Sequence, residues 1–104
     1  MKSQPFKLYV VISSKLKSGL KIAQACHALR QFSGEHPIID KYWFQESNNI
    51  VCLQADDVGD LANDLEQKGL RLSRFHEPDM DNELTAIAVE PAAWRHLSNF
   101  RLAS

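Results

Sequence analysis

Four polar side chains, in separate parts of the chain, are of types that could move a proton or donate a hydrogen bond to a reacting group. Gln24 and His27 are three residues apart in a predicted helix, off its apolar stripe, so they contact a substrate or simply face water. Glu77 follows a predicted strand, where a carboxylate could accept a proton or orient water for hydrolysis. Thr85 begins another strand and could donate to an ester or a phosphate, although a lone threonine usually packs as an ordinary β-branched strand residue.

The stretch from Ser13 to Gly19 could bind an anion. It joins a strand to a helix, and the start of a helix offers unpaired N–H groups and the positive end of a dipole. Lys15, Lys17 and Lys21 add full positive charges in and beside this loop. Phosphate would suit it, but the loop is not a Gly-x-x-x-x-Gly-Lys-[Ser/Thr] sequence and does not imply a nucleoside triphosphate. The alternative is that these lysines are only solvated.

Charge is unevenly distributed along the chain, whose net charge is −1. Residues 1–34 contain no acid and all of the following bases: Lys2, Lys7, Lys15, Lys17, Lys21 and Arg30. All 13 acids lie in the rest of the chain. Such an asymmetry indicates an anionic partner, or else arises by chance or by pairing of these cations with acids elsewhere in the fold.

The chain offers little for a metal, a cofactor or a nucleophilic serine. His76, Glu77 and Asp79 are close in sequence, but no His-x₃-His pair or carboxylate cage accompanies them, so we expect no bound metal and no cofactor. No Cys-x-x-Cys pair and no Gly-x-Ser-x-Gly sequence occur. Cys26 and Cys52 have apolar neighbours and are expected to be buried free thiols rather than a disulfide.

The elements that must position these groups follow from hydrophobic periodicity and turn signals. Apolar, β-branched runs predict four strands, at Phe6–Ile12, Ile50–Gln54, Leu70–Phe75 and Leu84–Val89. Between the first two, a helix that Ser18 caps and Ser33-Gly34 ends is expected to bury one apolar stripe. The stripe consists of Ile22, Ala25, Cys26, Leu29 and Phe32.

Three shorter helices complete the pattern. Pro37 opens the first of them, whose expected inner face consists of Ile38, Tyr42 and Trp43. The second is capped by Asp56-Asp57 and stopped by Lys68-Gly69. Pro91 suits the first turn of the last, which holds Trp94 and Leu97.

The order β-α-α-β-α-β-β-α predicts a single α/β domain over residues 1–104, with a mixed four-stranded sheet and helices on both faces. The second strand, its helix and the third strand form a crossover unit of parallel strands, whereas the short connection at 76–83 favours an antiparallel pair of the third and fourth. Ligands of open sheets bind beyond the carboxyl ends of parallel strands. We therefore expect the lysine loop and Glu77 at one edge.

The composition and the lack of long apolar runs indicate the cellular compartment in which we expect the protein. The 104 residues are 44% hydrophobic and 24% charged, as in a chain that folds around an apolar core. No apolar run approaches the roughly 18 residues needed to span a bilayer, and the N-terminus does not resemble a signal peptide. We expect a soluble, cytoplasmic protein without membrane contact. A domain this small has modest stability, which favours a homodimer.

Taken together, these segments resemble the type 2 peptidyl-tRNA hydrolases over nearly the whole chain. The family's Gly-Lys-x-Ala-Ala-Gln-x-x-His-Ala is similar to Gly19-Leu-Lys-Ile-Ala23-Gln24-Ala-Cys-His27-Ala28. Its Gly-Leu before the third strand matches Gly69-Leu70. Its Thr-Val-Leu-Ala-Ile-Gly-Pro is similar to Thr85-Ala-Ile-Ala-Val-Glu-Pro91. The resemblance identifies a divergent member of bacterial or phage type.

The resemblance implies an activity and roles. Enzymes of this family cleave the ester between a peptide and the 3′ end of tRNA, so the acceptor end of tRNA is the implied partner. His27, Glu77 and Thr85 would serve catalysis. The implied substrate-binding residues are Lys15, Lys17, Lys21 and Gln24.

The chain departs from the family in three places. Leu20 replaces the lysine after the glycine, with Lys21 one place later. Glu77-Pro78-Asp79-Met80-Asp81 replaces Asp-Ala-Gly-x-Thr, and Leu53 occupies the place of a lysine usual in the second strand. The alternatives are a non-catalytic module that binds RNA or protein on the same scaffold, and an esterase for another anionic substrate.

Overall fold

The two central strands of the sheet are its most apolar segments. In the computed structural model, which describes residues 6–104, β1 (Lys7–Ser13) and β4 (Glu83–Val89) lie between β2 (Asn49–Ala55) and β3 (Leu72–Glu77), in the order β2-β1-β4-β3. Val10, Val11 and Ile87 have no exposed surface, because helices cover both faces. The strands of such a doubly covered centre read as continuous apolar runs. Lys2, one of the N-terminal cations, lies outside the described residues.

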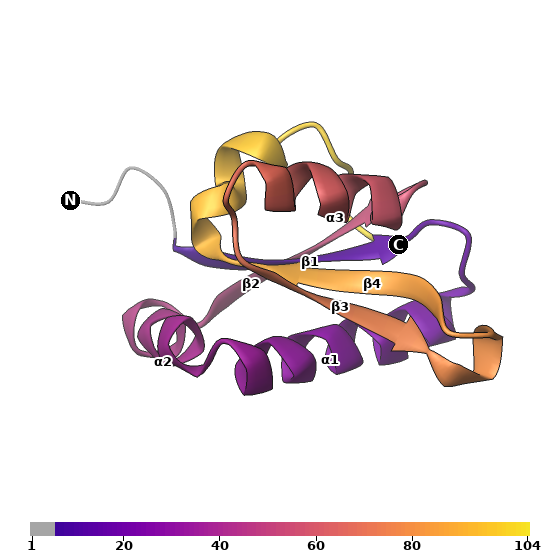
Figure 1. The fold of residues 1–104 in the computed structure, drawn as a ribbon, viewed down its shortest axis with the longest axis horizontal. Helices are drawn as coiled ribbons and strands as arrows, with labels where there is room; N and C mark the ends of the chain where they lie inside the picture. Colours follow the sequence, from indigo (N-terminus) through magenta and orange to yellow (C-terminus); the bar gives the residue numbers. More distant parts are fainter. Residues whose placement is uncertain (1–5) are drawn as a thin grey trace.

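The predicted α/β architecture and element order are confirmed. Figure 1 shows α1 (Ser18–Glu35) and α2 (Pro37–Glu46) beneath the sheet, with α3 (Val58–Gln67) and the C-terminal segment above it. Two short 3₁₀ helices, η1 (Pro78–Met80) and η2 (Pro91–His96), flank β4. One apolar cluster packs between the sheet and α1 and α2, and a second between the sheet, α3 and η2.

The predicted strand directions are confirmed, and the order of the strands across the sheet was not predicted. β2 pairs parallel with β1, and β3 pairs antiparallel with β4, which is itself antiparallel to β1. β2 and β3 therefore run in the same direction, as expected of the crossover unit, but at opposite edges of the sheet. The apolar β1 and β4 take the centre. The carboxyl ends of β1, β2 and β3 consequently lie at the same end of the sheet, which we call its carboxyl end.

Helix α1 is rotated relative to the predicted apolar stripe. Its buried residues are Gln24, Ala28 and Phe32, whereas Ile22 is 68% exposed and Cys26 is also exposed. The predicted stripe is therefore only partly right. The polar Gln24 can face the sheet because both ends of its amide find hydrogen-bond partners there.

Several local predictions need correction. Ile38 and Tyr42 of α2 are 84% and 56% exposed, and Trp43 alone of the three is buried. Cys26 and Cys52 are free thiols as expected, but Cys26 is exposed and Cys52 only half-buried. The remaining corrections concern helix ends. Lys17 rather than Ser18 is the N-cap of α1, without a side-chain cap bond, and α1 continues through Gly34 to Glu35.

Other local predictions are confirmed. Asp57 caps α3, because its carboxylate accepts a hydrogen bond from the Asp60 amide at 2.9 Å. Gly69 adopts a φ of +82° just after α3, a left-handed conformation that glycine takes without strain. These signals fix where α3 begins after β2 and where it ends before β3.

A bulge interrupts the pairing of β4 with β3. Phe75 pairs with Ala86, but the next residue, His76, pairs with Leu84, so Thr85 is an extra residue on β4. Leu84 packs with the cluster around α3, whereas Thr85 contacts α1 and Ala86 belongs to the cluster around α1. Two successive β4 side chains thus face α1. A bulge re-aims a side chain in this way, here towards Gln24.

The last residues lie along the outer edge of β2. The Ala103 amide donates to the Cys52 carbonyl at 2.9 Å, the Gln54 amide donates to the Arg101 carbonyl at 3.0 Å, and Leu102 bridges Leu53. This tail covers the carboxyl-terminal half of the strand. Among residues 6–104, no helix is both long and apolar enough to cross a membrane.

Candidate functional site

Three polar side chains from different elements meet between α1 and the sheet, near the carboxyl end of β3. The Thr85 hydroxyl donates to Gln24 Oε1 at 2.6 Å, and Gln24 Nε2 donates to Glu77 Oε1, also at 2.6 Å. Thr85 is fully buried and Gln24 is 1% exposed, while Glu77 is half-buried at the end of β3. The chain of hydrogen bonds therefore runs from the interior to the surface.

The direction of these hydrogen bonds is fixed by chemistry. An ionised carboxylate only accepts, so the Gln24 amide must turn its NH₂ group towards Glu77 and its oxygen towards Thr85. The Thr85 hydroxyl must then donate to that oxygen. Its proton is committed inside the protein, so Thr85 positions Gln24 in this arrangement and does not itself reach a substrate.

Glu77 is held as the carboxylate anion. The hydrogen bond from Gln24 is the main cause that lowers its pKa, followed by the backbone amide of Asp79, which donates to Glu77 Oε2 at 3.2 Å. The charge of nearby His27 lowers the pKa of Glu77 slightly further, against a small opposing effect of desolvation. Glu77 is therefore ionised near neutral pH and available as a base.

The loop after Glu77 is short and tightly folded. η1 follows immediately, and Asp81 and Asn82 both take left-handed conformations, with φ of 54° and 60°. Asparagine and aspartate tolerate this region better than most residues. The Asn82 amide donates to the Glu77 carbonyl at 2.9 Å, so the turn holds the Glu77 backbone in place.

His27 lies beside this carboxylate and is exposed. Its ring stacks on Phe75, with 4.5 Å between ring centroids and 10° between planes. The stack holds the imidazole at the surface, next to Glu77. Phe75 was not among the predicted site residues, although strand alternation places Phe75 and Glu77 on the same face of β3. That alternation was the signal that could have identified it.

The predicted lysines do not form one group. Lys15 and Lys17 are exposed in the loop that leads from β1 to α1, at the same end of the sheet as Glu77, where both β1 and β3 finish. Lys21 instead points to β2, the strand at the other side of the sheet from β3, where its ammonium donates to Gln54 Oε1 at 3.2 Å and to the backbone oxygen of Ser104 at 3.0 Å. Lys21 therefore lies apart from the two loop lysines.

The loop lysines have no acidic partner within the described part of the chain. The ion pairs there join Lys68 to Asp64 and Arg74 to Glu66. The first turn of α1 contains no acid, so the positive end of this helix is also uncompensated by its own side chains. Internal pairing of Lys15 and Lys17 with acids is thus not found, which leaves their charges available to an anionic partner.

An acidic surface borders the lysine loop. The Ser14 hydroxyl donates to Asp56 Oδ1 at 2.6 Å, and Asp56, Asp57 and Asp60 line a hollow of about 570 Å³ at the start of α3. A polyanion approaching Lys15 and Lys17 would be repelled from this side of the loop. The sequence did not indicate this contact, because Ser14 and Asp56 are 42 residues apart.

Residues that could bind a metal do not gather in the described part of the chain. Across residues 6–104, no three histidine, cysteine, aspartate or glutamate side chains are arranged to hold a metal ion. Leu53 of β2 is 5% exposed and belongs to the core around α3. That part of β2 therefore contributes packing and no charge to the edge.

Comparison with known proteins adds no relative. No protein-family model matches the chain, and no curated protein matches it at a significant level.

The interior half of the hydrogen-bond chain can be tested through stability. Thr85→Val keeps the side chain's shape but leaves Gln24 Oε1 buried without a donor, so we expect unfolding to become easier by about 1–3 kcal/mol. Thr85→Ser retains the hydroxyl and should cost less. Urea denaturation followed by circular dichroism measures both. Equal stability of Thr85→Val and the parent protein would contradict the assigned bond.

Proposed function

We propose that the protein hydrolyses the ester between a peptide, or an N-blocked amino acid, and the 3′ end of tRNA. The observation that carries the proposal is the ordered Thr85–Gln24–Glu77 chain, which ends at the surface in an ionised carboxylate beside an exposed His27. The sequence resemblance to type 2 peptidyl-tRNA hydrolases gives the substrate class. The substrate would be used in the cytoplasm, where translation produces it.

The proposed reaction needs only a base and a proton donor, which Glu77 and His27 supply. Glu77 accepts a proton from a water molecule, and the water oxygen attacks the ester carbonyl. The C–O bond to the ribose then breaks, and the 3′ oxygen takes a proton, which the exposed His27 beside Glu77 could donate in its protonated form. The products are a free carboxylate and tRNA with a 3′ hydroxyl. An acyl ester is already activated, so no metal step is required.

Lys15 and Lys17 are the groups suited to the phosphates of the acceptor end. Both are exposed at the same edge as Glu77, without an acidic partner among the described residues. Phosphate contacts of this kind release counterions, so affinity falls with salt in proportion to the number of contacts. Lys21 is omitted from this surface because its ammonium lies at β2.

The proposal is tested by turnover of N-acetyl-aminoacyl-tRNA. We expect release of the N-acetyl amino acid, with kcat/KM falling roughly tenfold between 50 and 200 mM salt if two lysines contact phosphates. Replacing both Lys15 and Lys17 by glutamine should flatten this salt dependence. Lys41→Gln, an exposed lysine of α2, is the matched control and should leave it unchanged.

One observation favours a second candidate, a non-catalytic RNA-binding module. Thr85 is fully buried and its hydroxyl proton is committed to Gln24, so it is not available to a reacting centre. Salt-dependent tRNA binding without hydrolysis above background, at high protein concentration, would select this module and exclude the enzyme. Activity on simple esters without tRNA binding would instead indicate an esterase for another substrate.

A further inference from the structure

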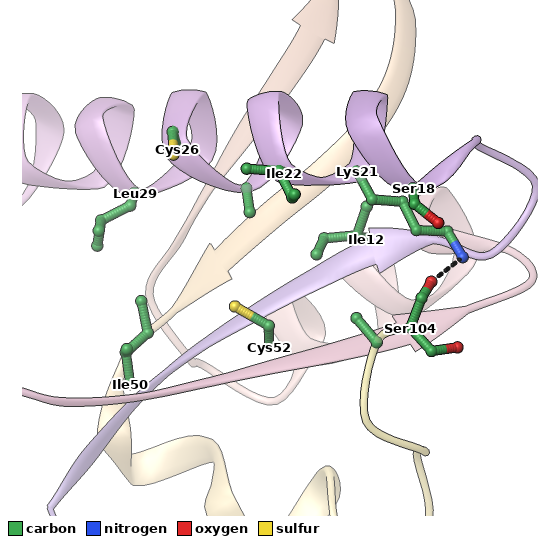
Figure 2. A pocket seen from close by; sticks show the side chains of 11 residues that line it. Ile12, Ser18, Lys21, Ile22, Cys26, Leu29, Ile50, Cys52 and Ser104 are labelled. Atoms are coloured by element: carbon green, nitrogen blue, oxygen red, sulfur yellow. Dashed lines mark hydrogen bonds between the residues drawn. The ribbon is translucent and has the colours of Figure 1, made fainter.

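The two outermost strands of the sheet differ in whether other residues cover their outer sides. The C-terminal tail covers β2 over its carboxyl-terminal half, and Figure 2 shows Ser104 of this tail hydrogen-bonded to Lys21 of α1. β3 is the last strand on the other side of the sheet, with α1 below it and α3 above it (Figure 1). Among residues 6–104, no strand and no tail pairs with the outer side of β3.

The pairing of β3 with β4 determines which backbone groups β3 turns outward. The Glu90 amide donates to the Arg71 carbonyl at 3.1 Å, so the backbone of Arg71 faces β4. Successive residues of a strand turn their backbone groups to opposite sides, so those of Leu72, Arg74 and His76 face outward. The bulge does not disturb this alternation on β3, because its extra residue belongs to β4.

His36 occupies one end of this outer side. Its Nε2 lies 3.0 Å from the carbonyl oxygen of Leu72, and since a carbonyl only accepts, the ring nitrogen must donate. In the described part of the chain, no group hydrogen-bonds to the outward amide or carbonyl of Arg74 or His76. The free stretch therefore begins just after Leu72 and ends at Glu77, the proposed base.

We propose, resting on the hydrolysis proposed above, that the peptide part of the substrate binds along the outer side of β3 as a fifth strand. Because Glu77 is the last residue of β3, the free stretch ends at the carboxylate that would activate water. A peptide with its ester beside Glu77, and its other residues extending back towards Leu72, runs parallel to β3. Strand addition uses main-chain hydrogen bonds, which suits a substrate whose peptide sequence varies.

The parallel register decides which peptide groups form hydrogen bonds. With the esterified residue opposite Glu77, the His76 carbonyl accepts from the amide of that residue, and the His76 amide donates to the carbonyl of the third residue back from the ester. The Arg74 carbonyl accepts from the amide of the same third residue, and the Arg74 amide donates to the fifth carbonyl. The amides of the second and fourth peptide residues face away from β3.

The first test compares two substrates that differ in peptide length. N-acetyl-aminoacyl-tRNA reaches only the His76 carbonyl, whereas acetyl-tetra-alanyl-tRNA forms three further hydrogen bonds, because its acetyl carbonyl stands at the fifth position. Each bond contributes about two- to tenfold, so we expect kcat/KM to be at least about tenfold higher for the longer substrate. Equal values for the two substrates would overturn the proposal.

N-methylation of the longer peptide tests the register. A methyl group on the amide of the third residue removes the bond to the Arg74 carbonyl and pushes the peptide away from β3, so the advantage of the longer substrate should be lost. The matched control is a methyl group on the amide of the fourth residue, which faces away, and it should change kcat/KM by less than about twofold. Equal effects of the two methyl groups would contradict pairing along β3.

Arg74→Pro tests the same contact from the side of the protein. Proline has no amide proton to donate to the fifth carbonyl, and because this amide faces away from β4, the substitution breaks no bond of the sheet. The variant should lose about two- to tenfold on the longer substrate and keep the parent rate on N-acetyl-aminoacyl-tRNA. Arg74→Ala is the matched control, since it also loses the contacts with Asn63 and Glu66 but retains the amide.

A binding measurement separates the peptide site from the proposed hydrolysis. The probe is acetyl-tetra-alanine joined by an amide to 3′-amino-3′-deoxyadenosine, which has no ester to cleave. It should slow hydrogen exchange of the Arg74 and His76 amides, followed by NMR. Protection without turnover of any tRNA substrate would support the peptide site and exclude the hydrolase.

Two results of this measurement would overturn the peptide site. The first is turnover that does not depend on peptide length, together with no protection of either amide, which would leave the hydrolase standing. The second is a dimer in which both amides are protected before the probe is added, because a second copy of the chain would then occupy β3.

Discussion

Replacing Glu77 by glutamine is expected to lower kcat/KM for N-acetyl-aminoacyl-tRNA by at least about a hundredfold, the usual contribution of a general base. Glutamine has nearly the same shape but cannot accept the proton of the attacking water. Because Glu77 lies at the surface end of the hydrogen-bond chain, the variant should fold normally. Single-turnover release of the N-acetyl amino acid, with circular dichroism as the check on folding, measures the effect.

The matched control is Glu83→Gln. Glu83 pairs with Glu77 across the two strands but is exposed at the start of β4 and has no place in the proposed chemistry. It should retain activity within about twofold, as is usual for surface substitutions away from a site. Equal activity of Glu77→Gln and the parent protein would remove Glu77 from the mechanism.

The pH profile of the same reaction reports on the hydrogen bond from Gln24. That bond lowers the pKa of Glu77, so the base stays ionised, and activity is lost only as pH falls through this lowered pKa. Gln24→Leu removes the donor, and the pKa should rise towards the ordinary glutamate value. The acid limb of the profile should then move to higher pH. An unmoved limb in a folded, active variant would contradict the bond.

Phe32→Ala is expected to lower the free energy of unfolding by about 3–5 kcal/mol, because Phe32 is fully buried between α1 and the sheet. A small domain has a total stability of about 5–15 kcal/mol, so much of the variant would unfold under mild denaturant. Urea denaturation followed by circular dichroism measures the loss.

Ile22→Ala is the control that tests the rotation of α1. The apolar spacing alone places Ile22 and Phe32 on one buried stripe, yet Ile22 is 68% exposed. Its truncation should therefore change stability by no more than about 0.5 kcal/mol. Similar losses for Ile22→Ala and Phe32→Ala would mean that α1 buries the predicted stripe after all.

The sheet and its helices could be predicted because their signals are local. Runs of β-branched residues, the aspartate cap of α3 and the glycine that ends it each act within a few residues, and all agree with the structure. The order of the strands across the sheet depends on all four strands at once, because the most apolar strands take the buried centre. The sequence therefore predicted the directions of β2 and β3 but offered no order of the strands across the sheet.

The candidate site could be predicted in part. The spacing of Gln24 and His27, and the position of Glu77 after a strand, indicated an edge where distant residues meet, and the structure joins Gln24 to both Glu77 and Thr85. The rotation of α1 was missed because periodicity treats glutamine as a surface residue. Its amide is buried only because two partners, 53 and 61 residues away in sequence, satisfy it.

The bulge at Thr85 was the least predictable feature. Strict alternation from Ile87 and Val89 would turn Thr85 towards α3, and only the extra residue on β4 turns it towards Gln24. The position of Lys21 was likewise not predicted, because its contacts with Gln54 and Ser104 join residues 33 and 83 positions apart in the sequence. The predicted homodimer and cytoplasmic location stay predictions.

The C-terminal tail along β2 also protects the protein from aggregation with other copies of the same chain. An uncovered outer strand offers its amides and carbonyls to any other extended chain, which is how sheets join into polymers. Residues 101–103 pair with those groups on the carboxyl-terminal half of β2. A variant without this tail would keep its core but expose unpaired backbone groups along β2. At high protein concentration it would aggregate while still folded.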